Sequence, residues 1–179
     1  MILIVDNGKG AQEIERSVRG SKQIVKAKDA LNMKAGGIIL SDGDMKHMKE
    51  NINIIKKWNK PLLAIGTSYI FLASAYGAKS KEGKIEKTER VNIEHPCPLT
   101  LDLKRTFNVI QSCNHMLEDL PENFSVIASS QKYEFKIIGD MEKPFFGVHF
   151  NPELGGDGIK IIDNFVKSVD VWEKYHKGQ

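Results

Sequence analysis

The sequence has few of the features that mark membrane, secreted or disordered proteins. Its 179 residues include only 2 cysteines and 6 prolines, and no apolar run approaches the roughly 20 residues of a membrane-spanning helix. Two cysteines cannot build the disulfide framework of a small secreted domain, and the apolar start at residues 2–5 is too short for the core of a signal peptide. We therefore expect a cytoplasmic protein with reduced thiols and no membrane partner.

Neither sign of charge dominates. There are 26 basic and 23 acidic residues, and this balance argues against nucleic acid as the main partner. Hydrophobic residues make up 41% of the chain, enough for a core, and the length suits a single domain over residues 1–179. Basic residues between 79 and 90 are interleaved with Glu82, Glu86 and Glu89, which predicts a solvated hairpin of mixed charge.

Short apolar segments alternate with helical patterns in the first half of the chain. Strands are expected at residues 2–5, 23–27, 36–41 and 61–65, and helices at residues 11–18, 45–58 and 68–76. This alternation predicts a mainly parallel sheet covered by helices on both faces.

The second half has a different pattern. Polar, alternating segments at 84–93, 106–113 and 124–129 predict a small antiparallel section. A buried strand at 144–150 and a helix with a broad apolar stripe at 157–175 complete an α/β protein.

Two segments carry a resemblance to a known family. In open α/β sheets, ligands bind at the carboxyl ends of the strands. There, residues 61–77 (PLLAIGTSYIFLASAYG) resemble the nucleophile-elbow segment of the class I glutamine amidotransferases, and residues 146–153 (FGVHFNPE) resemble the segment with the catalytic His and Glu. The chain is most similar to the stand-alone glutaminase subunit of archaeal GMP synthase. The resemblance implies a three-layer, flavodoxin-like sandwich.

The resemblance also locates the catalytic positions, and two of the three are altered. The family uses a Cys nucleophile, a His that deprotonates it and a Glu that orients the His. These positions fall on Gly66, Asn151 and Glu153, so only the acid is retained. Glycine relieves the positive-φ strain of an elbow, which suggests that the turn is kept without its thiol. An amide at 151 cannot act as a general base.

The oxyanion loop departs from the family as well. Its Gly-Gly-Pro reads Asp42-Gly43-Asp44 here, and carboxylates oppose a developing oxyanion but suit a cation or an amine. Asp44 is expected to cap the helix that begins near residue 45, whereas Asp42 has no equally simple explanation. With Thr67 and Ser68, Asp42 and Gly43 form the expected ligand pocket.

Other residues could replace the lost nucleophile or base. Ser68 and Thr67 are hydroxyls beside the elbow, although Ser68 is better explained as the N-cap of the next helix. His149 is expected to share the face of Asn151 as a relocated base, with a half-buried strand histidine as the simpler interpretation. Cys97 follows His95, and Cys113 precedes His115, but neither cysteine is expected at a strand-end turn.

We therefore expect a catalytically degenerate amidotransferase homologue, with no cofactor or metal, that is a binding or regulatory protein. Its ligand would be a small amine or amino acid, or its partner would be a synthetase subunit or an active paralogue. The alternative is an enzyme, either an active GMP synthase-type glutaminase subunit or a hydrolase with a relocated nucleophile. A purely structural dimer partner is a third possibility. The stretch 111–115 retains Ser112 of the family's Ser-His-x-Asp-Glu motif but places Cys113 at the His.

Overall fold

A computed structural model describes residues 1–176. Within this range, nine strands form one sheet in the order β2-β1-β3-β4-β11-β10-β9-β6-β7. The parallel part consists of β1 (Ile2–Val5), β2 (Lys22–Val25), β3 (Gly37–Leu40), β4 (Leu62–Ile65) and β11 (Phe145–Val148). Between residues 1 and 176 no helix is long and apolar enough to cross a membrane.

Antiparallel strands extend the same sheet beyond β11. They are β10 (Ile137–Asp140), β9 (Phe124–Ser129), β6 (Thr88–Ile93) and β7 (Thr106–Ile110). A separate two-stranded sheet pairs β5 (Ser80–Glu82) with β8 (His115–Leu117). The antiparallel section is therefore continuous with the parallel core.

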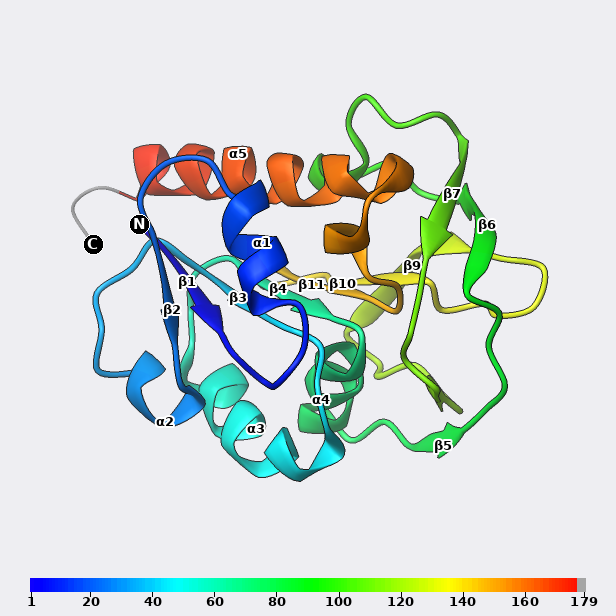
Figure 1. Ribbon diagram of the computed structural model, residues 1–179, viewed down its shortest axis with the longest axis horizontal. Coiled ribbons are helices and arrows are strands. Elements are labelled where there is room, and N and C mark those ends of the chain that lie inside the picture. Colours follow the sequence, from blue (N-terminus) through cyan, green and yellow to red (C-terminus); the bar gives the residue numbers. More distant parts are fainter. Residues whose placement is uncertain (177–179) are drawn as a thin grey trace.

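Helices cover both faces of the sheet (Figure 1). On one face lie α1 (Ala11–Ser17) and α5 (Ile159–Tyr175), and on the other α2 (Ala27–Ala30), α3 (Met48–Lys57) and α4 (Thr67–Ala75). Short 3-10 helices occur at η1 (Met45–His47), η2 (Pro98–Thr100), η3 (Pro152–Leu154) and η4 (Gly156–Gly158). The predicted three-layer α/β sandwich is confirmed.

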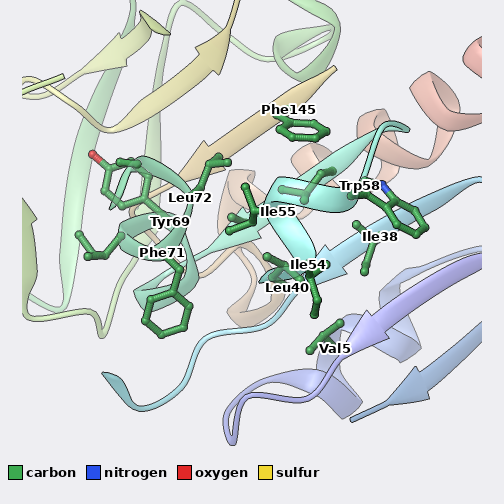
Figure 2. Packing of buried hydrophobic residues seen from close by; sticks show 14 of the residues in the cluster. Val5, Ile38, Leu40, Ile54, Ile55, Trp58, Tyr69, Phe71, Leu72 and Phe145 are labelled. Atoms are coloured by element: carbon green, nitrogen blue, oxygen red, sulfur yellow. The ribbon is translucent and has the colours of Figure 1, made fainter. Parts of the chain in front are cut away.

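Alternation along the strands divides the core between the two faces. Leu3 and Val5 pack with α3 and α4, whereas Ile2 and Ile4 pack with α1 and α5. Figure 2 shows the first of these clusters, in which Ile54 of α3 and Trp58, directly after α3, pack close to side chains of the sheet. Because α4 is buried along most of its length, the elbow that precedes it is held from several sides.

In the second half, one strand was missed and two sequence-based expectations were wrong. β10 was not anticipated, because it is only four residues long and contains Gly139. The strand expected at 106–113 ends at Ile110, and residues 111–114 leave the sheet. The mixed-charge segment at 79–90 is not a hairpin, since β5 pairs with β8 while β6 pairs with β7 and β9.

Candidate functional site

The loops after four parallel strands meet at one edge of the sheet. Lys9 N, after β1, donates to Asp42 O, after β3, at 3.1 Å, and Gly8 and Gly43 form an antiparallel bridge. Gly66 N, after β4, donates to Val148 O at the end of β11, at 2.9 Å. The positions chosen from the sequence are therefore adjacent in the fold.

Gly66 forms the elbow between β4 and α4. Its φ is 59° and its ψ is −121°, a conformation that L residues rarely adopt. A Cβ atom at this position would lie 2.5 Å from Cγ of Asp42 and 2.6 Å from Oδ1. Glycine at 66 therefore meets two requirements, the backbone conformation and the close approach of a carboxylate.

The Asp42 carboxylate lies over the elbow and accepts hydrogen bonds through both oxygens. Oδ1 accepts from the backbone amides of Thr67 and Gly43, each at 2.8 Å. Oδ2 accepts from Ser112 Oγ at 2.9 Å and from Asn151 Nδ2 at 3.0 Å. In nucleophile-elbow enzymes, the amide after the nucleophile and an amide from a neighbouring loop form the oxyanion hole. Here the amide after Gly66 and the amide of Gly43 in the loop after β3 both donate to Asp42 Oδ1.

Asp42 is a buried anion stabilised by dipoles. The residue is only 1% exposed, and among residues 1–176 no ion pair includes it. Burial acts to raise the pKa of Asp42, but the hydrogen bonds from Thr67, Asn151 and Ser112 outweigh burial, and the pKa lies below its usual value. The expectation that Asp42 would attract a cation is not matched by this geometry, because its oxygens face donors of the protein.

Asn151 links Asp42 to the retained acid. Its Oδ1 accepts from Ser112 N at 2.8 Å, and its Nδ2 donates to Asp42 Oδ2 and to Glu153 Oε1, each at 3.0 Å. The Asn151 side chain is therefore held between the loop after β3 and Glu153. The Asn151 amide itself neither takes up nor releases a proton near neutral pH.

Glu153 is buried and partly unpaired. It is 8% exposed, and its Oε2 has no hydrogen-bond partner within residues 1–176. Burial raises the pKa of Glu153 to about 7, although the bond from Asn151 acts in the opposite direction. Gly10 lets the backbone before α1 approach, because a Cβ there would lie 2.5 Å from Glu153 Oε1.

The two remaining residues near the elbow have structural partners. Ser68 is not the N-cap of α4, which begins at Thr67 after Gly66. Ser68 Oγ instead donates to Ser41 O at 2.5 Å and accepts from Asn7 Nδ2 at 3.0 Å, which ties α4 to the loops after β1 and β3. Asp44 does act as a cap, since its Oδ1 accepts from Lys46 N at 2.8 Å at the start of η1.

His149 lies in a different environment from Asn151. Its Nε2 lies 2.8 Å from His115 O, and its Nδ1 lies 3.2 Å from Nζ of the buried Lys136. Desolvation, followed by the charge of Lys136, lowers the pKa of His149 to about 4. The expected shared face with Asn151 is absent because β11 ends at Val148, so the strand alternation does not continue. The two side chains have no common hydrogen-bond partner.

One of the two cysteines lies closer to the elbow than expected. Because the chain leaves the sheet after Ile110, Cys113 is buried with its Sγ 3.9 Å from Thr67 Oγ1. Burial raises the pKa of the Cys113 thiol to about 11, which disfavours the thiolate. Cys97 precedes η2 and packs against the opposite face of the sheet, and burial raises the pKa of its thiol as well.

Ser112 is the functional residue that the sequence reasoning did not select. It is close to both Asp42 and Asn151 although 70 and 39 residues separate it from them. The available signal was its retention in the stretch matched to the Ser-His-x-Asp-Glu motif. A cavity of about 390 Å³ lies beside these groups, and its lining includes Lys9, Asp44, Glu82 and His115.

The sequence is similar to those of known glutamine amidotransferases. The family model of class-I glutamine amidotransferases matches residues 3–169. One subunit of the glutamine-hydrolysing GMP synthase from Methanocaldococcus jannaschii is 30% identical over 181 residues, covering 93% of this chain and 96% of the relative. The protein of the same description from Pyrococcus abyssi is also 30% identical, covering 93% and 97%.

Solved structures have the same fold. A Thermoplasma acidophilum protein described as a GMP synthase subunit superposes with a TM-score of 0.91 at 23% identity, covering 98% of this chain and 96% of that one. A glutamine amidotransferase of Thermotoga maritima gives a TM-score of 0.68 at 17% identity, covering 99% and 85%. The match of the family model over most of the sequence, together with the two relatives, shows that this chain belongs to the class I glutamine amidotransferase family.

Proposed function

We propose that this chain is a catalytically degenerate member of its family that acts as a non-hydrolytic binding or regulatory protein. The observation that carries the proposal is the position of Asp42. Its carboxylate accepts from the two amides that an oxyanion would need, and Cγ lies 2.5 Å from the place of a Cβ at residue 66. An anion already in this position opposes the developing negative charge of a tetrahedral intermediate.

The nearby nucleophiles and bases support the same conclusion. Ser68 Oγ donates to a backbone carbonyl and is not paired with a histidine. The Cys113 thiol has a pKa raised to about 11 by burial, and His149 has both ring nitrogens occupied within the core. A relocated Ser–His or Cys–His pair would need the nucleophile and the base within hydrogen-bond reach of each other. The contacts of Ser68 and His149 given above are with other groups.

We assign the ligand to the cavity at the mouth of the inherited site. Lys9 provides a positive charge there, and Asp44 and Glu82 provide negative charges. This mixture suits a small amine or a zwitterionic amino acid better than a simple anion. The alternative binding partner is a synthetase subunit, because the chain matches two GMP synthase subunits over 96% and 97% of their length.

Ammonia release from glutamine tests the proposal. The purified protein, alone and with a GMP synthase synthetase subunit, is expected to release none above background, whereas an active amidotransferase assayed in parallel does. Release by the wild-type protein would favour the alternative, an active glutaminase subunit with a relocated nucleophile. Amino acids and small amines can then be compared by their effect on the melting temperature of the wild-type chain.

A series of variants isolates the contribution of Asp42. Gly66→Cys with Asn151→His is expected to recover little or no hydrolysis while Asp42 remains. Adding Asp42→Gly removes both the competing anion and the contact with the new Cβ, so that hydrolysis should rise above that of the double variant. Asp44→Gly is the matched control, because Asp44 caps η1 and does not bond to the elbow amides. Substantial activity in the double variant would show that Asp42 is no obstacle.

A further inference from the structure

Four donors converge on the Asp42 carboxylate, three of them from segments remote in the sequence and one from the next residue. The amides of Gly43 and Thr67 approach Oδ1, and Ser112 Oγ and Asn151 Nδ2 approach Oδ2. All four hydrogen bonds measure 2.8–3.0 Å, within the usual range. Such a set of converging N–H and O–H groups is how proteins bind a carboxylate without a cation.

Each donor is also positioned by contacts that do not involve Asp42. The elbow before Thr67 is held by the bond from Gly66 N to Val148 O. Gly43 packs against the backbone of Asn7, since a Cβ on Gly43 would lie 1.8 Å from Asn7 O. The donors should therefore keep their places when the carboxylate is removed.

Ser112 and Asn151 hold each other in the same way. Ser112 N donates to Asn151 Oδ1 at 2.8 Å, which fixes the Asn151 amide with its Nδ2 toward the carboxylate. Glu153 Oε1 accepts the second hydrogen of that amide at 3.0 Å. Asn151 thus presents a donor to this position independently of which anion occupies it.

From these contacts we infer that the chain contains a preformed receptor for a small carboxylate and that Asp42 is its permanently tethered occupant. The inference deepens the proposed function and rests on it, because it explains what fills the inherited site. The ligand class of the emptied receptor is a planar monocarboxylate no larger than acetate. Formate matches the carboxyl group alone, and acetate is larger by one methyl group.

Two variants of Asp42 should differ in how well they bind a carboxylate of a given size. Asp42→Ala removes the carboxyl group but keeps Cβ, which would overlap with a formate carbon placed where Cγ stood. Asp42→Gly also removes Cβ and so provides the space that the non-bonded contact of formate with the chain needs. Formate should therefore bind Asp42→Gly more tightly than Asp42→Ala, and acetate should bind Asp42→Gly more weakly than formate. A ligand that binds only the folded state raises the melting temperature. At ligand concentrations well above the dissociation constant, this rise is proportional to the logarithm of the concentration.

Melting temperatures provide the test. Formate and acetate are titrated into each variant, with chloride keeping the ionic strength constant. We expect a rise of about 3 to 5 °C for each tenfold increase in formate once the receptor is saturated. The wild-type protein should show no such rise, because Asp42 fills the site. Equal shifts in wild type and variants, or no shift in the variants, would overturn the inference.

Two matched variants control for loss of charge alone. Asp42→Asn keeps the shape of the side chain and leaves no vacancy, so formate should not stabilise it. Asp170→Ala removes an exposed carboxylate of α5, far from this site in the chain, and it should also be insensitive to formate. A formate response in either variant would contradict a site defined by the Asp42 position.

A measurement on the unmodified protein covers the case in which the Asp42 variants do not fold. In NMR spectra recorded with falling pH, the amide protons of Gly43 and Thr67 should shift together as Asp42 takes up its proton. Absence of a coupled shift would overturn the inference without any variant. Neither experiment measures glutamine hydrolysis. Ammonia release by the wild-type protein would therefore contradict the proposed function, whereas the formate titration and the NMR spectra test the carboxylate receptor separately.

Discussion

At the scale of single residues, Asp42 and Gly66 compete for one region of space. A Cβ at residue 66 would lie 2.5 Å from Asp42 Cγ, and the backbone there has a φ of 59°. Two separate effects therefore oppose any side chain at 66, namely backbone strain and overlap with the carboxylate. Gly77, in contrast, has only the first of these.

Gly66→Ala is expected to reduce the free energy of unfolding by more than Gly77→Ala does. Gly77 has a φ of 92° and nothing within 4 Å of its Cβ position, so its substitution should cost about 1 kcal/mol of backbone strain alone. The overlap at 66 should add about 1 to 3 kcal/mol. In the Asp42→Gly background this addition should largely disappear. Urea denaturation of Gly66→Ala and Gly77→Ala, each alone and in the Asp42→Gly background, measures the coupling energy between residues 42 and 66. Additive effects of Gly66→Ala and Asp42→Gly would show that the contact between these residues does not affect stability.

That Asp42, Gly66 and Asn151 lie close together could be predicted from the sequence, because they follow strand ends and the strand ends of a parallel sheet share one edge. The function of Asp42 could not be predicted in this way. It depends on Ser112, which reaches the elbow only because the chain leaves the sheet after Ile110. The hydrogen bond of Ser68 to Ser41 was also missed, since an N-cap and a tertiary contact have the same local sequence.

At the scale of elements, a buried charged cluster joins the antiparallel strands to the parallel core. Lys136, just before β10, is 1% exposed, and its Nζ lies 2.6 Å from Glu89 Oε2 of β6 and 2.5 Å from Gln111 Oε1 after β7. Its third neighbour is His149, after β11. Burial lowers the pKa of Lys136, while Glu89 acts to raise it.

Lys136→Met should reduce the free energy of unfolding by about 3 to 5 kcal/mol, because it leaves the Glu89 carboxylate buried without its cation. Adding Glu89→Gln removes that unpaired charge and should restore much of the loss. The pair Lys132 and Glu86 is the control, since both side chains are 64% exposed, and breaking it should change stability by less than about 1 kcal/mol. A loss of similar size at both pairs would refute this account of the cluster.

The same elements show which parts of the fold the sequence can specify. Fully apolar strands such as β1 and β4 were predicted closely, because four-residue apolar runs ending in turns are typical of buried parallel strands. The surroundings of Lys136 were not predicted. A lysine followed by two isoleucines and a glycine indicates neither a core position nor a strand, and Glu89 looked solvated among its charged neighbours.

At the scale of the whole molecule, two buried groups give folding opposite dependences on pH. The pKa of Glu153 is raised to about 7, so the folded state holds a proton that the unfolded chain has lost, and stability falls as pH rises from about 4.5 to 7. The pKa of His149 is lowered to about 4, so folding releases a proton, and stability falls as pH drops from about 6.5 to 4. Between about pH 4.5 and 6.5 the contributions of Glu153 and His149 to the pH dependence of stability should largely cancel.

Glu153→Gln should reveal the pH dependence of stability that the titration of His149 causes. Without the titrating acid, the free energy of unfolding is expected to rise by up to about 3 kcal/mol between about pH 4 and 6.5, and the wild-type decline toward about pH 7 should disappear. Urea denaturation across this range measures both effects, with exposed Glu122→Gln as the control. An unchanged profile in Glu153→Gln would mean that Glu153 titrates normally in the folded protein.

The contact between positions 42 and 66 also constrains the history of the chain. An aspartate held over the elbow in its present conformation cannot coexist with a side chain at 66, because their atoms would lie 2.5 Å apart. The loss of a nucleophile that we propose for position 66 therefore had to precede, or accompany, the arrival of this carboxylate. A cysteine introduced at 66 alone would overlap with the Asp42 carboxyl group. Under the proposed function, a return to a side chain at 66 thus requires a change at residue 42 first or at the same time.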